Sequence, residues 1–275
     1  MLMSVRLDEF RRRVWEYYRA HGRHDLPWRD VEPDGRLDPY KVLVSELMLQ
    51  QTQVTRVIPK FERFVRRFPN IFSLAEAPLA EILREWNGLG YNRRAKFLWQ
   101  AAGRIVHDHA GVVPNSLPEL VALPGIGINT AGAILAYAYN KPNVFIETNV
   151  RSVFLYHFFA GKRDVSDKDI AEMVVQTLPD NPRMWYWALM DYGTHLKQTT
   201  GNPNTLSKHY AKQSVFVGSK RHIRGRVLRE LMNKSLGVKD LRRVIADERL
   251  VDVLDDLQRE GLVEKRRGRY KLAGS

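Results

Sequence analysis

The nonapeptide Leu123-Pro-Gly-Ile-Gly-Ile-Asn-Thr-Ala131 carries two glycines one residue apart behind Leu-Pro, a pattern typical of a tight hairpin that no side chain obstructs. The apolar run over residues 131–139 predicts a helix with Thr130 near its start. Backbone N–H groups at such a helix start point outward and, with the helix dipole, favour binding of a phosphate. We therefore expect this segment to bind the nucleic-acid backbone without reading the base sequence. An ordinary tight turn is the alternative. The residues expected to contact this backbone are Pro124, Gly125, Ile126, Gly127 and Thr130.

The composition limits the partners of the chain and its redox chemistry. Among 275 residues there are 44 Lys and Arg against 31 Asp and Glu, so the formal net charge is +13 and the isoelectric point is about 9.9. Such a charge favours a polyanionic partner, either nucleic acid or an anionic membrane surface. The absence of cysteine excludes disulfides, a thiolate nucleophile and a cysteine-held metal, and it fits a cytosolic protein.

The length and the hydropathy pattern predict a soluble chain with one large domain, or with one medium and one small domain. No apolar run approaches the roughly 20 residues needed to span a bilayer. Residues 1–10 also lack the apolar core of a signal peptide. We therefore expect a cytoplasmic monomer, associated with the nucleoid if the source is bacterial, that does not enter a membrane.

Helical periodicity dominates the first three-quarters of the chain, and strand alternation is almost absent before residue 213. Pro39 opens one of the expected helices, as proline often does at a first helical position. Helices are expected over residues 7–20, 40–53, 54–68, 73–86, 92–109, 131–139, 166–178 and 182–196, and residues 117–122 lead into the hairpin. The sequence therefore predicts an all-α fold for this part of the chain.

The last 63 residues, 213–275, show a different pattern. Three helices are expected over residues 219–234, 239–245 and 248–259. Apolar and polar residues then alternate over 261–272 around Arg267-Gly268, as in a β-hairpin. This order resembles a winged-helix module, with a small protein-contact domain as the alternative. The basic residues expected to meet phosphates at the wing are Lys265, Arg266, Arg267 and Arg269.

Two glutamates stand out by their surroundings. Glu46 lies on an apolar helix face that is followed by a glutamine cluster. A carboxyl group buried there keeps its proton near neutral pH, as a general acid must. Glu147 lies between an apolar stretch and a new helix, so it is either a helix cap or a functional anion. A structural role remains the alternative for both residues.

Six motifs occur in the order that is found in one known family. They are Leu26-Pro-Trp-Arg29, Pro39-Tyr40, Ser45-Glu-Leu-Met-Leu-Gln-Gln-Thr-Gln-Val54, Gly88-Leu-Gly-Tyr91, Leu123-Pro-Gly-Ile-Gly127 and Met190-Asp-Tyr-Gly193. Over residues 8–200 the chain resembles the helix-hairpin-helix (HhH-GPD) DNA glycosylases, and among them it is most similar to the MutY adenine glycosylases. The resemblance implies a glycosylase domain over residues 1–212, with double-stranded DNA across a cleft and the target nucleotide flipped into it. Its helical barrel lobe is expected over 30–140, and its second lobe from 1–29 with 141–212.

The resemblance also implies roles for individual residues. Glu46 matches the general acid that protonates the departing base. Glu147 matches an aspartate that stabilises the oxocarbenium-like sugar, because this cleavage needs one protonated and one charged carboxyl group. The expected base-pocket residues are Arg29, Asn129 and Asn149. Gln51 and Tyr91 are expected at the gap in the base stack, and Gln50 is expected to contact DNA. Asn129 replaces the Schiff-base lysine of bifunctional members, so no lyase step is expected.

Three departures from the family pattern bear on function. The family has aspartate where this chain has Glu147, and the extra methylene displaces the carboxylate by about 1 Å, which can cost about a hundredfold in rate. The four cysteines of the family's iron–sulfur cluster are missing, so residues 194–210 must be held by packing, and no cofactor is expected. The hairpin backbone remains a candidate site for a monovalent cation. The C-terminal domain that reads 8-oxoguanine is replaced by the module at 213–275.

Three functions therefore compete. The first is a monofunctional glycosylase that removes adenine opposite 8-oxoguanine or guanine in base excision repair. The second is a glycosylase for mismatched thymine, uracil or a modified pyrimidine, since Glu147 and Asn129 change the pocket. The third is a lesion-binding protein with weak or no turnover, whose tail contacts DNA or a protein.

Overall fold

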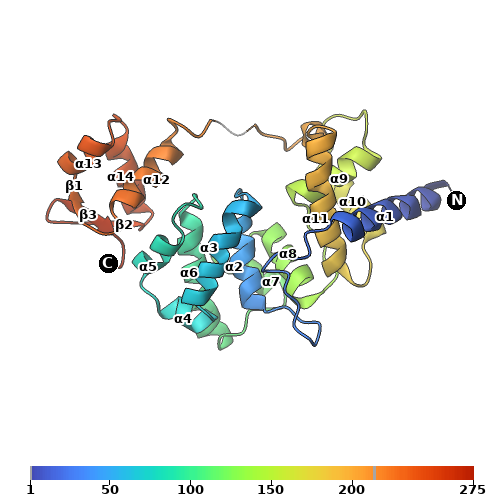
Figure 1. Cartoon of the computed structure of the whole chain (residues 1–275), viewed down its shortest axis with the longest axis horizontal. Helices are drawn as coiled ribbons and strands as arrows, with labels where there is room; N and C mark the ends of the chain where they lie inside the picture. The colour runs from blue at the N-terminus through green and yellow to red at the C-terminus, as the bar shows by residue number, and fades with distance from the viewer. Residues whose placement is uncertain (1, 213–214) are drawn as a thin grey trace. The chain divides into compact units, whose positions relative to one another are not determined.

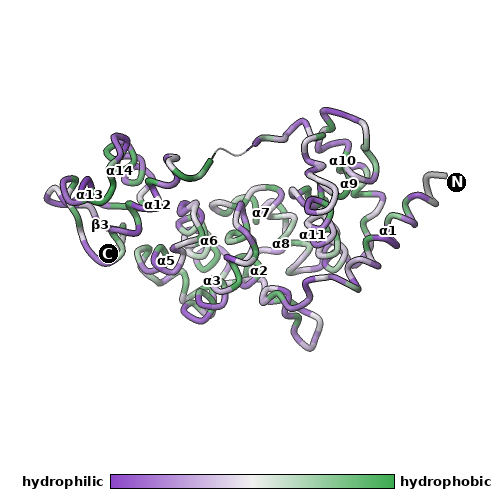
Figure 2. The backbone as a smooth tube through the Cα atoms, turned by 45° about the horizontal axis from the view of Figure 1, so that its top comes forward, coloured by the Kyte–Doolittle hydropathy of each residue, from purple (hydrophilic) through white to green (hydrophobic). Residues whose placement is uncertain are grey.

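The computed structural model describes residues 2–212 and 215–275, and the chain forms two compact units. Unit 1 comprises residues 1–42, 115–121 and 126–212, and unit 2 comprises residues 43–114, 122–125 and 213–275. Helix α2 (Pro39–Leu49) begins in unit 1 and continues in unit 2. Hydrophobic and hydrophilic residues are interleaved along most helices (Figure 2), as expected when each helix buries one face.

Unit 1 is helical, and its central helix α11 packs against α9 and α1 (Figure 1). Its elements are α1 (Leu2–His21), α7 (Leu117–Val121), α8 (Ile128–Tyr139), α9 (Thr148–Phe158), α10 (Asp167–Thr177), α11 (Pro182–Thr199) and the 3-10 helix η1 (Pro203–Leu206). An aromatic cluster joins the three packed helices, because the Phe10 ring lies 5.3 Å from that of Phe154 and 5.9 Å from that of Trp185. Each such ring removes on the order of 150–250 Å² from water, so this cluster contributes to the apolar core of unit 1.

Unit 2 combines a helical layer with a small α+β module. The helical layer contains α3 (Val54–Arg67), α4 (Ile71–Glu76), α5 (Leu79–Glu85) and α6 (Arg93–His109). The module contains α12 (Lys220–Glu230), β1 (Leu236–Gly237), α13 (Val238–Val244), α14 (Leu250–Arg259), β2 (Val263–Arg266) and β3 (Arg269–Leu272). Both α4 and α5 pack against α6, and α5 also contacts β3.

The strands of the module form an antiparallel sheet in the order β1-β3-β2. The register pairs Val263 with Leu272 and Arg266 with Arg269, so the predicted hairpin is confirmed. Arg267 and Gly268 turn the chain with φ angles of 48° and 75°, the left-handed pair that matches the twist of the flanking strands. The sequence analysis missed β1, because two residues are too short to show an alternation.

Several predicted helices were wrong in extent. The helix expected from residue 131 begins at Ile128, and the one expected over 219–234 ends at Glu230. The helix expected over residues 40–53 ends at Leu49, because Gln51 adopts a left-handed φ of 54°. The single helix expected over 73–86 is two helices, α4 and α5. Pro78 separates them, since a residue before proline avoids the helical region, and Ala77 accordingly has a ψ angle of 144°.

Candidate functional site

The glycine hairpin is formed as the sequence predicts. Gly125 has a φ angle of 77°, and a Cβ atom there would lie 2.5 Å from the Phe97 Cβ atom, so only glycine fits. Gly127 is the N-cap of α8. The Gly127 carbonyl accepts the first hydrogen bond of the helix, from Ala131 N–H at 2.9 Å. Thr130 therefore lies in the first turn of α8, where N–H groups have no acceptor within the helix. Binding of DNA or of a cation by this backbone stays a prediction.

Glu147 precedes α9 in extended conformation, with φ −87° and ψ 167°. Its side chain makes no capping hydrogen bond, so the capping alternative is wrong. Burial raises the pKa of the Glu147 carboxyl above its ordinary value. The Glu147 carboxyl group therefore lies at the start of α9, where its ionisation is unfavourable and where it makes no capping hydrogen bond.

Two asparagines determine the local backbone around Glu147. The Asn129 Oδ1 atom accepts a hydrogen bond from Ile146 N–H at 3.2 Å, which ties α8 to the residue immediately before Glu147. The Asn149 Oδ1 atom is buried, and it has no hydrogen-bond partner among the described residues. Such an orphaned acceptor indicates a donor that arrives with a ligand or with water. A Cβ atom on Gly193 would lie 2.3 Å from the Asn149 carbonyl oxygen, so glycine in α11 permits this close approach.

Arg29 is buried in an ion cluster of unit 1. Its two terminal nitrogens donate to the Asp191 carboxylate at 2.8 and 3.0 Å, and its guanidinium lies 5.2 Å from the Trp187 ring. Arg23 completes the cluster by donating its Nε to Asp191 at 2.7 Å. Burial acts to raise the pKa of Asp191, but the hydrogen bonds and charges of Arg29 and Arg23 hold it below its ordinary value. Asp191 belongs to the motif at residues 190–193, but its pairing with Arg29 was not predicted from the sequence.

Glu46 lies on the buried face of α2 in unit 2. The residue is 9% exposed, and its neighbours in sequence Leu43 and Leu47 are fully buried. A carboxyl group in such an environment favours its neutral form unless a charged partner compensates for the lost hydration. The predicted burial of Glu46 is therefore confirmed, while its role as a general acid stays a prediction.

Arg94 joins two turns that carry the predicted stack-filling residues. We call residues 50–52 the glutamine turn and residues 88–91 the glycine turn. Arg94 is 7% exposed, and its Nη1 donates to the carbonyls of Leu47, Met48 and Gln50 at 2.7, 2.9 and 2.5 Å. Its Nη2 donates to Thr52 Oγ1 at 2.9 Å and to the carbonyls of Leu89 and Gly90 at 3.2 and 3.1 Å. Arg94 was not predicted as a functional residue. Its position shortly after the glycine turn was the one feature of the sequence that pointed to it.

Gln51 of the glutamine turn and Tyr91 of the glycine turn have a left-handed backbone. Gln51 has a φ angle of 54° and Tyr91 a φ angle of 44°, and both side chains are exposed. Positive φ is uncommon for residues with a side chain, and it costs on the order of 1–3 kcal/mol unless the surroundings hold it. Both residues line a cleft of about 1130 Å³ in unit 2. Gln50, Gln51 and Tyr91 therefore line the same cleft, and their contact with DNA stays a prediction.

The four basic residues predicted at the wing lie exposed on the β2–β3 hairpin. Lys265 lies over the Tyr270 ring at 5.3 Å, and Arg266 pairs with Glu264 at 3.4 Å. Arg269 donates to the Ser235 carbonyl at 2.6 Å. The β2–β3 hairpin is therefore basic, and some of its basic side chains contact their own module.

The segment that carries an iron–sulfur cluster in the family is held here by side-chain packing and hydrogen bonds. The Asn204 Nδ2 donates to Ser152 Oγ at 2.6 Å, and Val165 N–H donates to the Leu206 carbonyl at 3.0 Å. Because the chain has no cysteine, its residues do not fit such a cluster. His195 instead stacks on the Tyr17 ring at 4.7 Å. Within residues 2–212 and 215–275, no three His, Asp or Glu side chains gather as metal ligands, and no helix is long and apolar enough to cross a membrane.

A helical chain in which a Leu-Pro-Gly-x-Gly hairpin opens a buried helix belongs to the class of helix-hairpin-helix proteins. Residues 44–178 match the HhH-GPD superfamily of base excision DNA repair proteins. The chain is also 34% identical to the adenine DNA glycosylase of Mycolicibacterium smegmatis over 280 residues, which covers 92% of this chain and 93% of that protein. The chain belongs to the HhH-GPD superfamily.

Other similarities agree with this assignment. The adenine DNA glycosylase of Buchnera aphidicola subsp. Baizongia pistaciae is 37% identical over 169 residues, which covers 62% of this chain and 46% of that protein. The chain thus spans about half of that relative. A solved thermostable thymine-DNA glycosylase superposes with a TM-score of 0.60 at 22% identity, over 70% of this chain and 88% of that one. At that identity the likeness concerns the fold alone.

Proposed function

We propose that this chain is a monofunctional DNA glycosylase that hydrolyses the N-glycosidic bond of a flipped adenine opposite 8-oxoguanine or guanine. The observation that carries the proposal is the similarity to an adenine DNA glycosylase over 92% of the chain. The two carboxyl groups singled out by the sequence support it, because Glu46 is buried on α2 and Glu147 is placed before α9 without capping it. The proposed glycosylase domain covers residues 1–212.

In the proposed mechanism Glu46 donates a proton to the departing base. Glu147 then stabilises the positive charge that develops on the sugar. Water adds to the sugar carbon and gives a proton to the Glu46 carboxylate that the first step leaves. Burial raises the pKa of Glu147, so its anion is unfavourable until a positive charge appears beside it. A carboxylate that gains its partner only during bond cleavage stabilises the transition state more than the bound substrate.

The monofunctional assignment rests on Asn129. A lyase step requires an amine that forms an imine with the sugar, and an asparagine amide cannot do so. The Asn129 side chain is instead occupied in holding Ile146, and hence the backbone that carries Glu147. Asn149 and Arg29 remain the other proposed pocket residues, with the buried Asn149 oxygen as an acceptor for the flipped nucleotide.

Double-stranded DNA is the proposed partner. The hairpin residues Gly125 and Gly127 would hold its backbone, and Gln51 and Tyr91 would fill the gap left in the base stack. The order helix, strand, two helices and hairpin in residues 215–275 supports a winged-helix module. Its exposed basic hairpin supports contact with phosphates.

The test is single-turnover base excision on duplexes with A:8-oxoG, A:G, A:C, G:T and G:U pairs, with and without alkali. We expect strand breakage at A:8-oxoG or A:G only after alkali. Glu46→Gln should abolish excision and leave duplex binding largely intact, and Glu62→Gln, on the surface helix α3, is the matched control. Breakage at a pyrimidine would instead support the second function, because Glu147 and Asn129 alter the pocket. Tight binding without any breakage would indicate a protein that binds lesions only.

A further inference from the structure

The cleft of unit 2 has walls from three separate parts of the chain. One wall is formed by the glutamine turn and the start of α3, and a second by the glycine turn and the start of α6. The third wall is α12 of the small module, which contributes Arg221, Arg224, Gly225, Leu228 and Arg229. The small module therefore reaches the residues proposed to fill the base stack mainly through α12, and Leu272 of β3 also lines the cleft.

The charge of this cleft suits a polyanion. Its lining contains six arginines, namely Arg56, Arg93, Arg94, Arg221, Arg224 and Arg229, and one acidic residue, Glu260. The Glu260 carboxylate is already paired, because Arg224 Nη1 donates to it at 3.1 Å. Arg56, Arg93 and Arg229 are exposed. Phe97 and Phe216 add aromatic surface. A basic groove with aromatic rings is the usual composition of a site for unpaired nucleotides.

Arg221 links α12 directly to the glycine turn. Its Nη1 donates to the Tyr91 hydroxyl at 2.6 Å, and its guanidinium lies 5.8 Å from the centre of the Tyr91 ring. Tyr91 is also the residue whose backbone has a positive φ angle. Arg94 of α6, three positions after Tyr91, contacts the same ring, with its guanidinium 5.6 Å from the ring centre. The Tyr91 side chain thus has cationic contacts from both α6 and α12.

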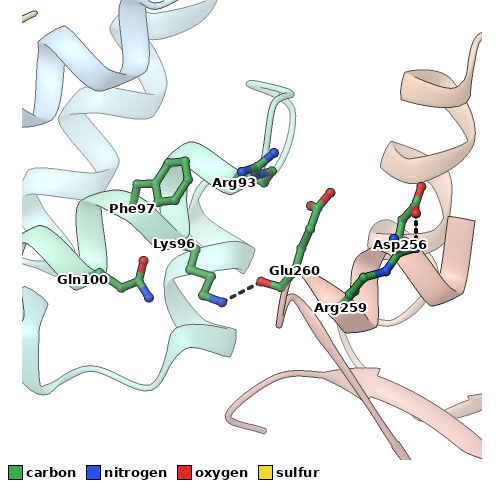
Figure 3. Close-up of a pocket in the computed structure, with 7 residues that line it drawn as sticks. All are labelled: Arg93, Lys96, Phe97, Gln100, Asp256, Arg259 and Glu260. Atoms are coloured by element: carbon green, nitrogen blue, oxygen red, sulfur yellow. Dashed lines mark hydrogen bonds and ion pairs between the residues drawn. The ribbon is translucent and has the colours of Figure 1, made fainter. Parts of the chain in front are cut away.

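The position of α12 within unit 2 is supported by contacts at its neighbours. Lys96 of α6 donates to the Glu260 carbonyl at the end of α14 at 2.6 Å (Figure 3). Arg84 of α5 donates its Nε to the Met232 carbonyl just beyond α12 at 2.8 Å. Both bonds pair a cation with a carbonyl near a helix C-terminus, where the helix dipole favours positive charge. These hydrogen bonds keep the arginines of α12 at the cleft.

We propose that this cleft binds the DNA strand that carries the base opposite the target nucleotide, with Arg221 and Arg229 holding its phosphates beside Tyr91. The proposal rests on the function proposed above. When the target nucleotide is flipped out, the residues that fill its place in the base stack contact the opposite base, which has lost its partner. The groove next to these residues therefore receives the strand that carries the opposite base. Selection of the opposite base would then depend on a helix of the small module. The wing residues Lys265 and Arg267 are outside the cleft lining.

The test compares Arg221→Gln and Arg229→Gln, singly and together, with Arg242→Gln as the matched control. Arg242 is exposed on α13 and is not part of the cleft lining. The probe is a duplex with the fluorescent base 2-aminopurine opposite the target position, whose emission rises when that base unstacks. Affinity is measured over a series of salt concentrations, and thermal unfolding checks that each variant is folded.

We expect the double variant to bind at least about tenfold more weakly. Its salt slope should fall by about 0.9 for each phosphate contact that is lost. The rise in 2-aminopurine emission should also be reduced, while Arg242→Gln behaves like the parent chain. An unchanged slope and emission in a folded double variant would overturn the proposal. A hairpin variant, Arg267→Gln, is measured in the same way, and a loss of slope and emission confined to it would also overturn the proposal.

The readouts do not require base removal, so the two proposals can fail separately. If no duplex is cleaved but the cleft variants lose the salt slope and the emission change, the glycosylase assignment fails and the strand site stands. If adenine is excised but the cleft variants bind and unstack the opposite base normally, the glycosylase assignment stands and the strand site is refuted.

Discussion

Replacing Arg94 with lysine tests whether one buried guanidinium holds the glutamine turn and the glycine turn together. The side chain has six hydrogen bonds, three from Nη1 to Leu47 and Met48 of α2 and to Gln50 of the glutamine turn, and three from Nη2 to Thr52, Leu89 and Gly90. Burial lowers the pKa of Arg94 to about 10, so the group remains charged at neutral pH. Lysine keeps this charge but offers all its donors from a single nitrogen.

The expected loss in the free energy of unfolding follows from the hydrogen-bond acceptors that lose their donor. One ammonium cannot reach both turns, so two or three buried oxygens lose their donor, at about 1–3 kcal/mol each. These losses are not additive, and we expect a total of about 3 kcal/mol. At about 2–4 °C for each kcal/mol in a unit of this size, the melting temperature should fall by about 6–12 °C.

The same change should reduce catalysis. Without Arg94 the positive φ angles of Gln51 and Tyr91 are no longer held, and a displacement of about 1 Å in a positioning group can cost about a hundredfold in rate. Thermal unfolding and single-turnover excision measure the two effects. Arg63→Lys is the control, because Arg63 pairs with Glu85 at the surface of α3. A lysine variant with parental melting temperature and parental excision rate would refute this account of the two turns.

Three further predictions concern unit 1. Asp191→Asn leaves the buried Arg29 without its counter-charge and should cost about 3–5 kcal/mol at pH 7 in thermal unfolding. Because the folded pKa of Asp191 is lowered, the parent should lose this stability as the pH falls below about 4, so equal acid sensitivity of variant and parent would contradict the assignment. Glu147→Gln should abolish excision and yet stabilise the protein at neutral pH, because the raised pKa makes the ionised carboxyl unfavourable in the folded state. That gain should be absent well below about pH 4.3 and grow as the pH rises, and a destabilised variant at pH 7 would exclude it. Asn129→Lys supplies an amine, so borohydride should trap a DNA adduct with this variant but not with the parent, and trapping with the parent would refute the monofunctional assignment.

Much of the local structure could be predicted because it depends on neighbouring residues. Gly127 begins α8, Pro182 begins α11, and Arg267-Gly268 turns the terminal hairpin, each through backbone preferences that act over a few positions. The burial of Glu46 followed from the apolar residues on its own helix face. Short-range patterns of this kind are read directly from the order of the residues.

Other features were decided only by tertiary contacts. Arg29 and Asp191 are 162 positions apart, and Arg221 and Tyr91 are 130 positions apart. No periodicity links such pairs, so the sequence could nominate Arg29 and Tyr91 without identifying their partners. The sequence also left Glu147 as either a cap or an anion, and the side-chain position excluded the cap. The residue order thus determined which side chains were available and where helices begin, whereas the packing of distant segments decided which charges meet, because that choice depends on burial and distance in the folded chain.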